Sequence, residues 1–193
     1  MSHPEYSPGL QGVVAGITHI SDINVERSVL TYRGYDVHIL AEKCSFEEVA
    51  YLVLHGDLPT KAQFGDFNKS LRGDRELPDG VYEVLRLLPK GCHPMDTLKV
   101  GATALALYDA ETCTQTHDAN MRKAIRIIAR MPALVANSYR MAYEGKPPVA
   151  PDPSLSIAGD FLHMLHDRKP TDLETNAINA SLIVYAEHGY NAR

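Results

Sequence analysis

Three segments of this chain carry the same four-residue helix-start pattern directly before an apolar stretch. The pattern is Ser or Thr, two further residues, then Glu or Gln, and it begins at Ser45, Thr60 and Thr171. In such a capping box the first side chain accepts a hydrogen bond from a free backbone amide of the first turn, and the fourth side chain accepts one from the amide of the first residue. Because these signals mark where helices begin, the sequence predicts a mainly α fold.

Glycine and proline predict where several helices end or begin. Gly56 stands where a left-handed terminal residue is wanted, and Gly73 is placed to end the next helix. Pro78 suits the first turn of a third helix. Pro132 lies inside the helical stretch 121–143 and is expected to break or kink it, because proline lacks a backbone donor and clashes with the preceding turn.

Apolar spacing predicts how deeply the later helices are buried. Residues 97–108 are rich in Ala and Leu and are expected to form a helix buried on most sides. A short helix is expected over 157–166. The helix that begins at Thr171 is expected to be central, because one broad stripe collects Leu173, Ala177, Ala180, Val184, Ile178, Leu182 and Ile183.

The N-terminal region has a different pattern. Residues 12–20 and 28–33 mix β-branched and polar residues around the turn-rich stretch 21–24, which predicts a short β-hairpin. Residues 1–11 are expected to be a flexible N-terminus, and residues 12–193 a single structural unit.

Composition excludes several classes of protein. The formal net charge is -5 with 19 Lys and Arg, and no run of basic residues suggests a nucleic-acid partner. No apolar run reaches the roughly 18 residues of a membrane span. The first residues lack the basic start and apolar core of a signal peptide. Three cysteines without a C-x-x-C pair argue against a disulfide framework or zinc cluster, so we expect a cytoplasmic protein.

Motifs of several common chemistries are absent from the sequence. There is no Gly-rich phosphate loop, no H-E-x-x-H and no G-x-S-x-G. His163 and His166 share one helical face, yet no third metal ligand is evident, so a histidine at a helix C-terminus is the preferred interpretation and no metal is expected. Asp96 is interpreted as a structural cap of the helix that follows it.

His188 lies near the end of the last predicted helix, and Asn191 follows it. Histidine can donate to a carbonyl or carboxylate, and asparagine offers both a donor and an acceptor. From this chemistry alone, a hydrogen-bonded core histidine and a ligand-binding histidine both remain open.

Several ordered segments together resemble the citrate synthase family, and within it the 2-methylcitrate synthases. No one segment would suffice, but nearly the whole chain takes part, through residues 9–16, 30–36, 45–50, 54–60, 93–96, 161–166, 185–188 and 191–192. The resemblance implies a mostly helical two-domain subunit in a homodimer. Residues 12–193 would form the N-terminal portion of its large helical domain, without the small CoA-binding domain or the C-terminal part.

The resemblance also implies a reaction. Members of this family condense an acyl-CoA with oxaloacetate, giving a tricarboxylic acid and free CoA, without a metal or redox cofactor. An aspartate removes a proton from the acyl-CoA and two histidines stabilise the enol and polarise the oxaloacetate, in a site that closes by domain movement. His188 and Asn191 match the family's H-E-x-N-A segment, which implies that both bind oxaloacetate. Gly189 and Arg193 depart from that segment, where glutamate and serine are usual.

Most catalytic segments of the family have no counterpart here. The sequence lacks G-P-x-H-G, G-x-G-H and D-P-R, so we expect this chain to be an inactive fragment of a longer enzyme. The alternative is a truncated, non-catalytic paralogue that acts as a helical interaction module. For the enzyme, Tyr185 and the segment 161–166 resemble 2-methylcitrate synthases and favour propionyl-CoA, with acetyl-CoA as the alternative substrate because one methylene contributes only about 1–3 kcal/mol of discrimination.

Overall fold

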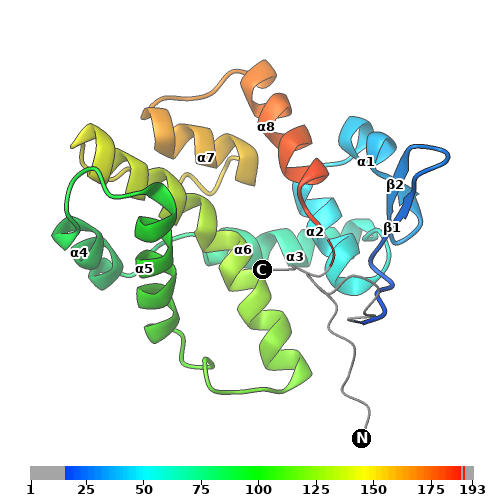
Figure 1. Ribbon diagram of the computed structural model, residues 1–193, viewed down its shortest axis with the longest axis horizontal. Helices are drawn as coiled ribbons and strands as arrows, with labels where there is room; N and C mark the ends of the chain where they lie inside the picture. Colours follow the sequence, from blue (N-terminus) through cyan, green and yellow to red (C-terminus); the bar gives the residue numbers. More distant parts are fainter. Residues whose placement is uncertain (1–15, 188, 190–193) are drawn as a thin grey trace, which may run out of the picture.

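The computed structural model of the protein describes residues 16–187 and 189. Within them a small antiparallel sheet precedes a set of packed helices (Figure 1). The elements are β1 (Ser21–Asn24), β2 (Val29–Tyr32), β3 (Tyr35–Asp36), α1 (Val37–Lys43), α2 (Phe46–His55), α3 (Lys61–Gly73), α4 (Asp79–Leu87), α5 (Pro94–Leu107), α6 (His117–Tyr139), the π-helical turn η2 (Arg140–Glu144), α7 (Ile157–His166) and α8 (Asp172–Val184). The mainly α prediction is confirmed.

The three capping boxes all form. At Ser45 the side-chain oxygen accepts from the amide of Glu48 at 3.3 Å, and a carboxylate oxygen of Glu48 accepts from the amide of Ser45 at 2.7 Å. Thr60 and Thr171 begin α3 and α8 in the same way. Gly56 ends α2 in the left-handed region with φ 100°, as the sequence predicts.

The predicted hairpin is present and its second strand, β2, lies within 28–33 as expected, but its first strand and its turn were misplaced. The stretch 21–24, expected to be a turn, is β1, and it pairs with β2 so that Ser21 faces Tyr32 and Asn24 faces Val29. The turn instead follows, where the Asn24 side chain accepts from the amide of Arg27 at 2.9 Å. The polar residues of β1 read as turn formers, but they lie along an exposed strand. The third strand, β3, was not predicted.

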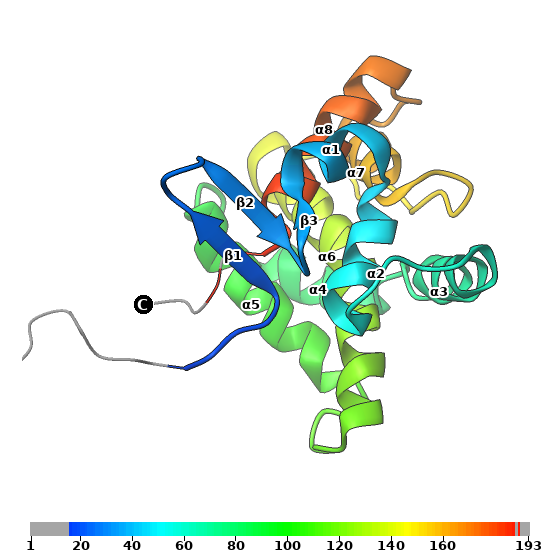
Figure 2. The ribbon, with the colours of Figure 1, turned by 90° about the vertical axis from the view of Figure 1, so that its right-hand side faces the viewer.

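Helix α6 runs through the middle of the helical layer and packs against α3, α5 and α7 (Figures 1 and 2). It continues as one helix through Pro132, so the expected break does not occur. The irregularity comes later, at the π-helical turn η2. Gly101 of α5 permits a close approach to α6, because a Cβ at that position would lie 2.6 Å from the Leu134 side chain.

Three apolar clusters make the core. One joins α4, α5 and α6 with Met164 of α7, a second joins β2, α1, α2 and the end of α8, and the third joins α2, α3, α6 and α7. The second cluster is the one that bears on the candidate site, because it contains both Tyr32 and Ile183 at 0% exposure.

Two burial predictions were wrong. Helix α5 buries one face only, and Leu107 on its other side is 82% exposed. Helix α8 is peripheral rather than central, because only Ile183 is buried while Leu173 is 80% and Val184 44% exposed. Both helices are apolar enough to be central, but among the described residues too few side chains cover them.

Candidate functional site

The end of α8 is held in place by a tyrosine from the sheet. The hydroxyl of Tyr32 donates to the carbonyl oxygen of Val184 at 2.8 Å and lies 3.3 Å from that of Glu187. The carbonyl of Val184 belongs to the last turn of α8, where acceptors have no donor within the helix. Burial raises the pKa of Tyr32, so the phenol stays a donor. The backbone of Glu187 is therefore fixed directly before His188.

Arg33 lies beside this segment because of a tight turn. Arg33 and Gly34 join β2 to β3 with positive φ values of 50° and 88°, the backbone that suits a two-residue hairpin turn. The Arg33 guanidinium donates to the carbonyls of His19 at 3.3 Å and Val53 at 3.0 Å. It thereby ties the approach to β1 and the end of α2 to one point.

A cavity of 350 Å³ opens between these elements. Its walls are the stretch 17–20, Arg33, Glu187 and Gly189. One carboxylate oxygen of Glu187 accepts from the amide of Gly189 at 2.6 Å, while the other, like Nε of Arg33, is buried and has no partner in the described part of the chain. A guanidinium and a carboxylate thus line one cavity, and charged groups of both signs suit a small polar ligand.

The two residues predicted to bind a substrate, His188 and Asn191, lie outside the described residues. Their ligand roles stay predictions. Only His188 has described residues on both sides, and these residues, Glu187 and Gly189, both line the cavity.

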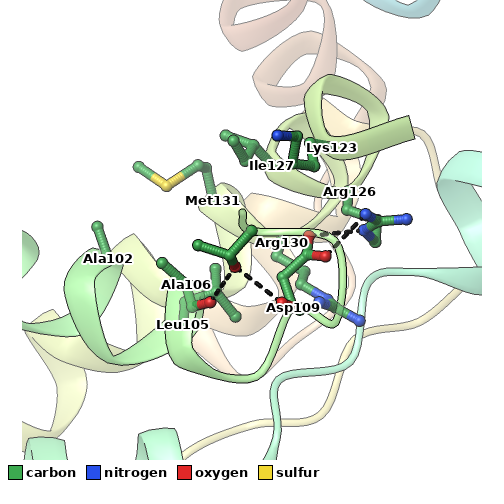
Figure 3. Close-up of a pocket in the computed structure, with 10 residues that line it drawn as sticks. Ala102, Leu105, Ala106, Asp109, Lys123, Arg126, Ile127, Arg130 and Met131 are labelled. Atoms are coloured by element: carbon green, nitrogen blue, oxygen red, sulfur yellow. Dashed lines mark hydrogen bonds and ion pairs between the residues drawn. The ribbon is translucent and has the colours of Figure 1, made fainter. Parts of the chain in front are cut away.

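A second cavity, of 290 Å³, lies between α5 and α6 and the loop that joins them (Figure 3). Its charged residues all have partners within the protein: Lys123 donates to the carbonyl of Thr114 at 2.6 Å, and Arg130 donates to that of Asp74 at 3.1 Å. Arg126 donates to both carboxylate oxygens of Asp109 at 2.8 Å, and also to Glu111, which Arg122 contacts as well. The two arginines, Arg122 first, lower the pKa of Glu111 to about 2. These pairs fasten the loop to α6, so we assign this cavity a structural role.

Two other sets of candidate residues from the sequence lie in α7 and α5. His163 and His166 lie in the last turn of α7, and no group of three or more metal-ligating side chains occurs in the described residues. The cap of α5 is His93, whose ring nitrogen accepts from the amide of Met95 at 3.2 Å, and not Asp96. Asp96 lies within the first turn and pairs with Lys99 at 3.1 Å.

The family model described as "Citrate synthase, C-terminal domain" matches residues 9–192 of this chain. The chain belongs to the citrate synthase family. A relative from Shewanella oneidensis, "2-methylcitrate synthase", is 41% identical over 184 residues, which are 95% of this chain and 48% of the relative. A Bacillus subtilis relative, "Citrate/2-methylcitrate synthase", is 38% identical over 95% of this chain and 49% of its own length.

The fold of this citrate synthase family member is also that of solved structures. The citrate synthase of the thermophilic archaeon Thermoplasma acidophilum, in a ternary complex with carboxymethyl coenzyme A and oxaloacetate, superposes with a TM-score of 0.89 at 31% identity. The match covers 97% of this chain and 49% of that one. The chain thus spans about half the length of the relatives it matches. Among the described helices, none is long and apolar enough to cross a membrane.

Sequence reasoning missed Tyr32 and Arg33 as site residues, although both lie in the segment 30–36 that carries the family resemblance. Their partners lie 152 and 20 residues away along the chain. No local pattern reports a contact of that range, so only the folded structure could reveal it.

Proposed function

We propose that this chain supplies part of an acyltransferase that condenses propionyl-CoA with oxaloacetate to give 2-methylcitrate and CoA. The observation that carries the proposal is the 41% identity to a 2-methylcitrate synthase over 95% of the chain. The similarity to a citrate synthase that binds oxaloacetate and a CoA analogue supports the substrate classes. Acetyl-CoA is the alternative acyl donor, because the relatives include one named for both activities.

His188 and Asn191 are the residues we propose for oxaloacetate binding. A protonated or donating imidazole suits a dicarboxylate, because charge-assisted hydrogen bonds are the stronger ones. Oxaloacetate titrated into the chain should perturb the ring resonances of His188 in histidine-selective NMR spectra. Asn191→Ala should weaken that response and Tyr185→Phe should not. No perturbation of His188 in either a short or an extended polypeptide would contradict the assignment.

We also propose that residues 12–193 are the N-terminal portion of the large helical domain and are inactive alone. The support is the half-length match together with the absence from the sequence of G-P-x-H-G, G-x-G-H and D-P-R. Release of free CoA thiol from acetyl-CoA and propionyl-CoA with oxaloacetate is the assay. Turnover by the purified 193-residue chain would reject inactivity. Reading the coding sequence after Arg193 separates a fragment, with those segments downstream, from a truncated interaction module.

The acyl preference needs a polypeptide with all family segments. Rates with propionyl-CoA should exceed those with acetyl-CoA at equal concentration, and a clear acetyl preference would overturn the choice.

We propose a cytoplasmic homodimer. Cys44, Cys92 and Cys113 are free thiols, as a reducing compartment allows, and the exposed apolar residues Val100 and Leu107 of α5 offer a contact face for a second subunit.

A further inference from the structure

Glu187 lies directly before the histidine proposed for oxaloacetate binding, and its backbone is held from the sheet. The Tyr32 hydroxyl donates to the carbonyl oxygen of Val184 at 2.8 Å and lies 3.3 Å from that of Glu187. Tyr32 is itself fully buried in the cluster that joins β2, α1, α2 and the end of α8. The core of the protein therefore sets where the chain leaves α8 and where Glu187 lies.

The side chain of Glu187 closes a turn over the next two residues. One carboxylate oxygen accepts from the Gly189 amide at 2.6 Å. Gly189 has a φ of 72°, in the left-handed region that glycine adopts without steric cost. A side-chain oxygen bonded to the backbone two residues further on acts as a backbone turn does, as in the turns that Asn and Asp form. The backbone is thus held both before and after position 188.

The bond between Glu187 and Gly189 is of a strong kind. Hydrogen bonds from a backbone amide to a carboxylate are charge-assisted and roughly twice as strong as those between neutral groups. The other carboxylate oxygen of Glu187 is buried, so water reaches this carboxylate from one side only. Competition from solvent for the Gly189 amide is reduced accordingly.

A direct contact with the substrate does not explain this carboxylate. Glu187 and Gly189 both line the 350 Å³ cavity, and the ligand proposed for it, oxaloacetate, is a dianion. A carboxylate in the wall repels such a ligand. Engaged with the Gly189 amide, however, the same carboxylate orders the backbone around the neighbouring histidine. Its favourable contribution to binding must then come through that backbone.

We propose that Glu187 is a positioning residue, whose carboxylate holds the Gly189 amide and so fixes the backbone that presents His188 to oxaloacetate. The proposal rests on the proposed function, because it takes His188 as the oxaloacetate-binding residue. Binding to a backbone that is already ordered avoids the loss of conformational freedom that a loose segment undergoes on binding. The acceptor atom of residue 187, and not its charge, is what the site requires.

Two substitutions separate the acceptor from the charge. Glu187→Gln keeps a side-chain oxygen that can accept from the Gly189 amide, whereas Glu187→Ala has no acceptor. Oxaloacetate titrations followed on the His188 ring resonances, in histidine-selective NMR spectra, give the dissociation constant. Glu187→Ala should raise it at least about tenfold, which corresponds to about 1.4 kcal/mol. Glu187→Gln should stay within about threefold of wild type, because its neutral hydrogen bond is weaker but still present.

A matched control and a stability measurement exclude a general effect on the fold. Glu42→Ala removes an acidic side chain of α1 that is 69% exposed and outside the cavity walls, so the dissociation constant should not change. Neither Glu187 nor Gly189 belongs to the three core clusters. The urea midpoint of Glu187→Ala should therefore stay close to that of wild type while its affinity falls.

The turn also has a signature that needs no ligand. The Gly189 amide should exchange with solvent at least about tenfold faster in Glu187→Ala than in wild type, because exchange requires the hydrogen bond to open. Glu187→Gln should restore most of the protection. The His188 ring resonances of the free chain should shift in Glu187→Ala and return toward their wild-type positions in Glu187→Gln.

The possible results separate this proposal from the proposed function. An unchanged dissociation constant in Glu187→Ala overturns the positioning role, and so does a Glu187→Gln variant as weak as Glu187→Ala, because charge would then be what matters. If the wild-type chain binds no oxaloacetate, the substrate role of His188 fails for this chain. The positioning role is then decided by the free chain: it stands if Gly189 exchange and the His188 resonances change in Glu187→Ala and recover in Glu187→Gln, and it is wrong otherwise.

Discussion

Asp160 on α7 pairs with Arg75, and both side chains are almost fully buried, with exposures of 2% and 3%. The carboxylate contacts the guanidinium at 3.0 Å and accepts the amide of Asp152 at 2.7 Å. Arg75 also donates to the carbonyl of Leu155 at 2.9 Å. The pair therefore holds the proline-rich loop before α7 against the segment between α3 and α4.

Asp160→Asn keeps the size of the side chain but removes the charge that balances Arg75. Loss of one partner of a buried pair leaves an uncompensated charge, so we expect a loss of about 3–5 kcal/mol in the free energy of unfolding, measured in urea. Asp96→Asn is the matched control, since Asp96 pairs with Lys99 at 3.1 Å but is 66% exposed, and it should change stability by less than about 0.5 kcal/mol. Equal losses of unfolding free energy in Asp160→Asn and Asp96→Asn would show that burial of the Asp160–Arg75 pair does not set the size of the loss.

Tyr32 links the sheet to the candidate site, and one atom makes the link. Tyr32→Phe should lower the free energy of unfolding by about 1–2 kcal/mol, because the carbonyls of Val184 and Glu187 lose their donor. The exchange of amides near the end of α8 should rise in the variant. Tyr185→Phe, which changes a side chain 82% exposed, should leave both quantities unchanged. Unaltered exchange in Tyr32→Phe would show that other contacts hold this segment.

At the scale of single elements, the start of α2 depends on its capping box. Ser45→Ala removes the acceptor for the amide of Glu48 and one donor to the Glu48 carboxylate. We expect the free energy of unfolding to fall by about 1 kcal/mol. Ser45→Thr should keep most of the stability, because a threonine hydroxyl can make both hydrogen bonds of the capping box. Urea titrations followed by far-ultraviolet circular dichroism measure both variants. A Ser45→Thr variant no more stable than Ser45→Ala would contradict the capping interpretation.

The connection between α5 and α6 gives a prediction for acid. The pKa of Glu111, held at about 2 by Arg122 and Arg126, lies below its ordinary value of 4.5. A carboxylate whose pKa is lower in the folded than in the unfolded state stabilises the fold. This contribution is complete when the pH is above the unfolded-state pKa, and it is lost as the pH falls toward the folded-state pKa. Wild type should therefore exceed Glu111→Gln in urea midpoint at pH 6, and the difference should shrink steadily between pH 4.5 and pH 2. A difference independent of pH would contradict it.

Elements were predictable from the sequence where their signals are local. The boxes at Ser45, Thr60 and Thr171 act over four residues, and all three helices begin where expected. The strand β1 was missed because its residues Ser21, Asp22 and Asn24 are also turn formers, and pairing with β2 decides between the two. The burial of α5 and α8 could not be predicted, because it depends on which other helices cover them.

At the scale of the whole molecule, the helices contribute unequal numbers of buried apolar side chains to the core. Helix α6 contributes Ala129, Ala133, Leu134 and Ala136, each at most 2% exposed, to two of the three core clusters. Helix α8 contributes one fully buried residue, Ile183, to the cluster around Tyr32. Regions with few buried apolar contacts open at lower free energy than the core.

The isolated chain should therefore exchange its amides in a fixed order. The slowest amides are expected between residues 129 and 137 of α6, where opening exposes two clusters at once. Those of α8 should exchange at least about tenfold faster, because that helix can detach without disrupting the layer around α6. Mass spectrometry of peptides from the two helices measures both rates in one sample. The contrary result is equal protection of α8 and α6 in a chain that is shown to be monomeric. The apolar stripe of α8 would then be covered within this polypeptide, and the interpretation of α8 as a peripheral helix would be wrong.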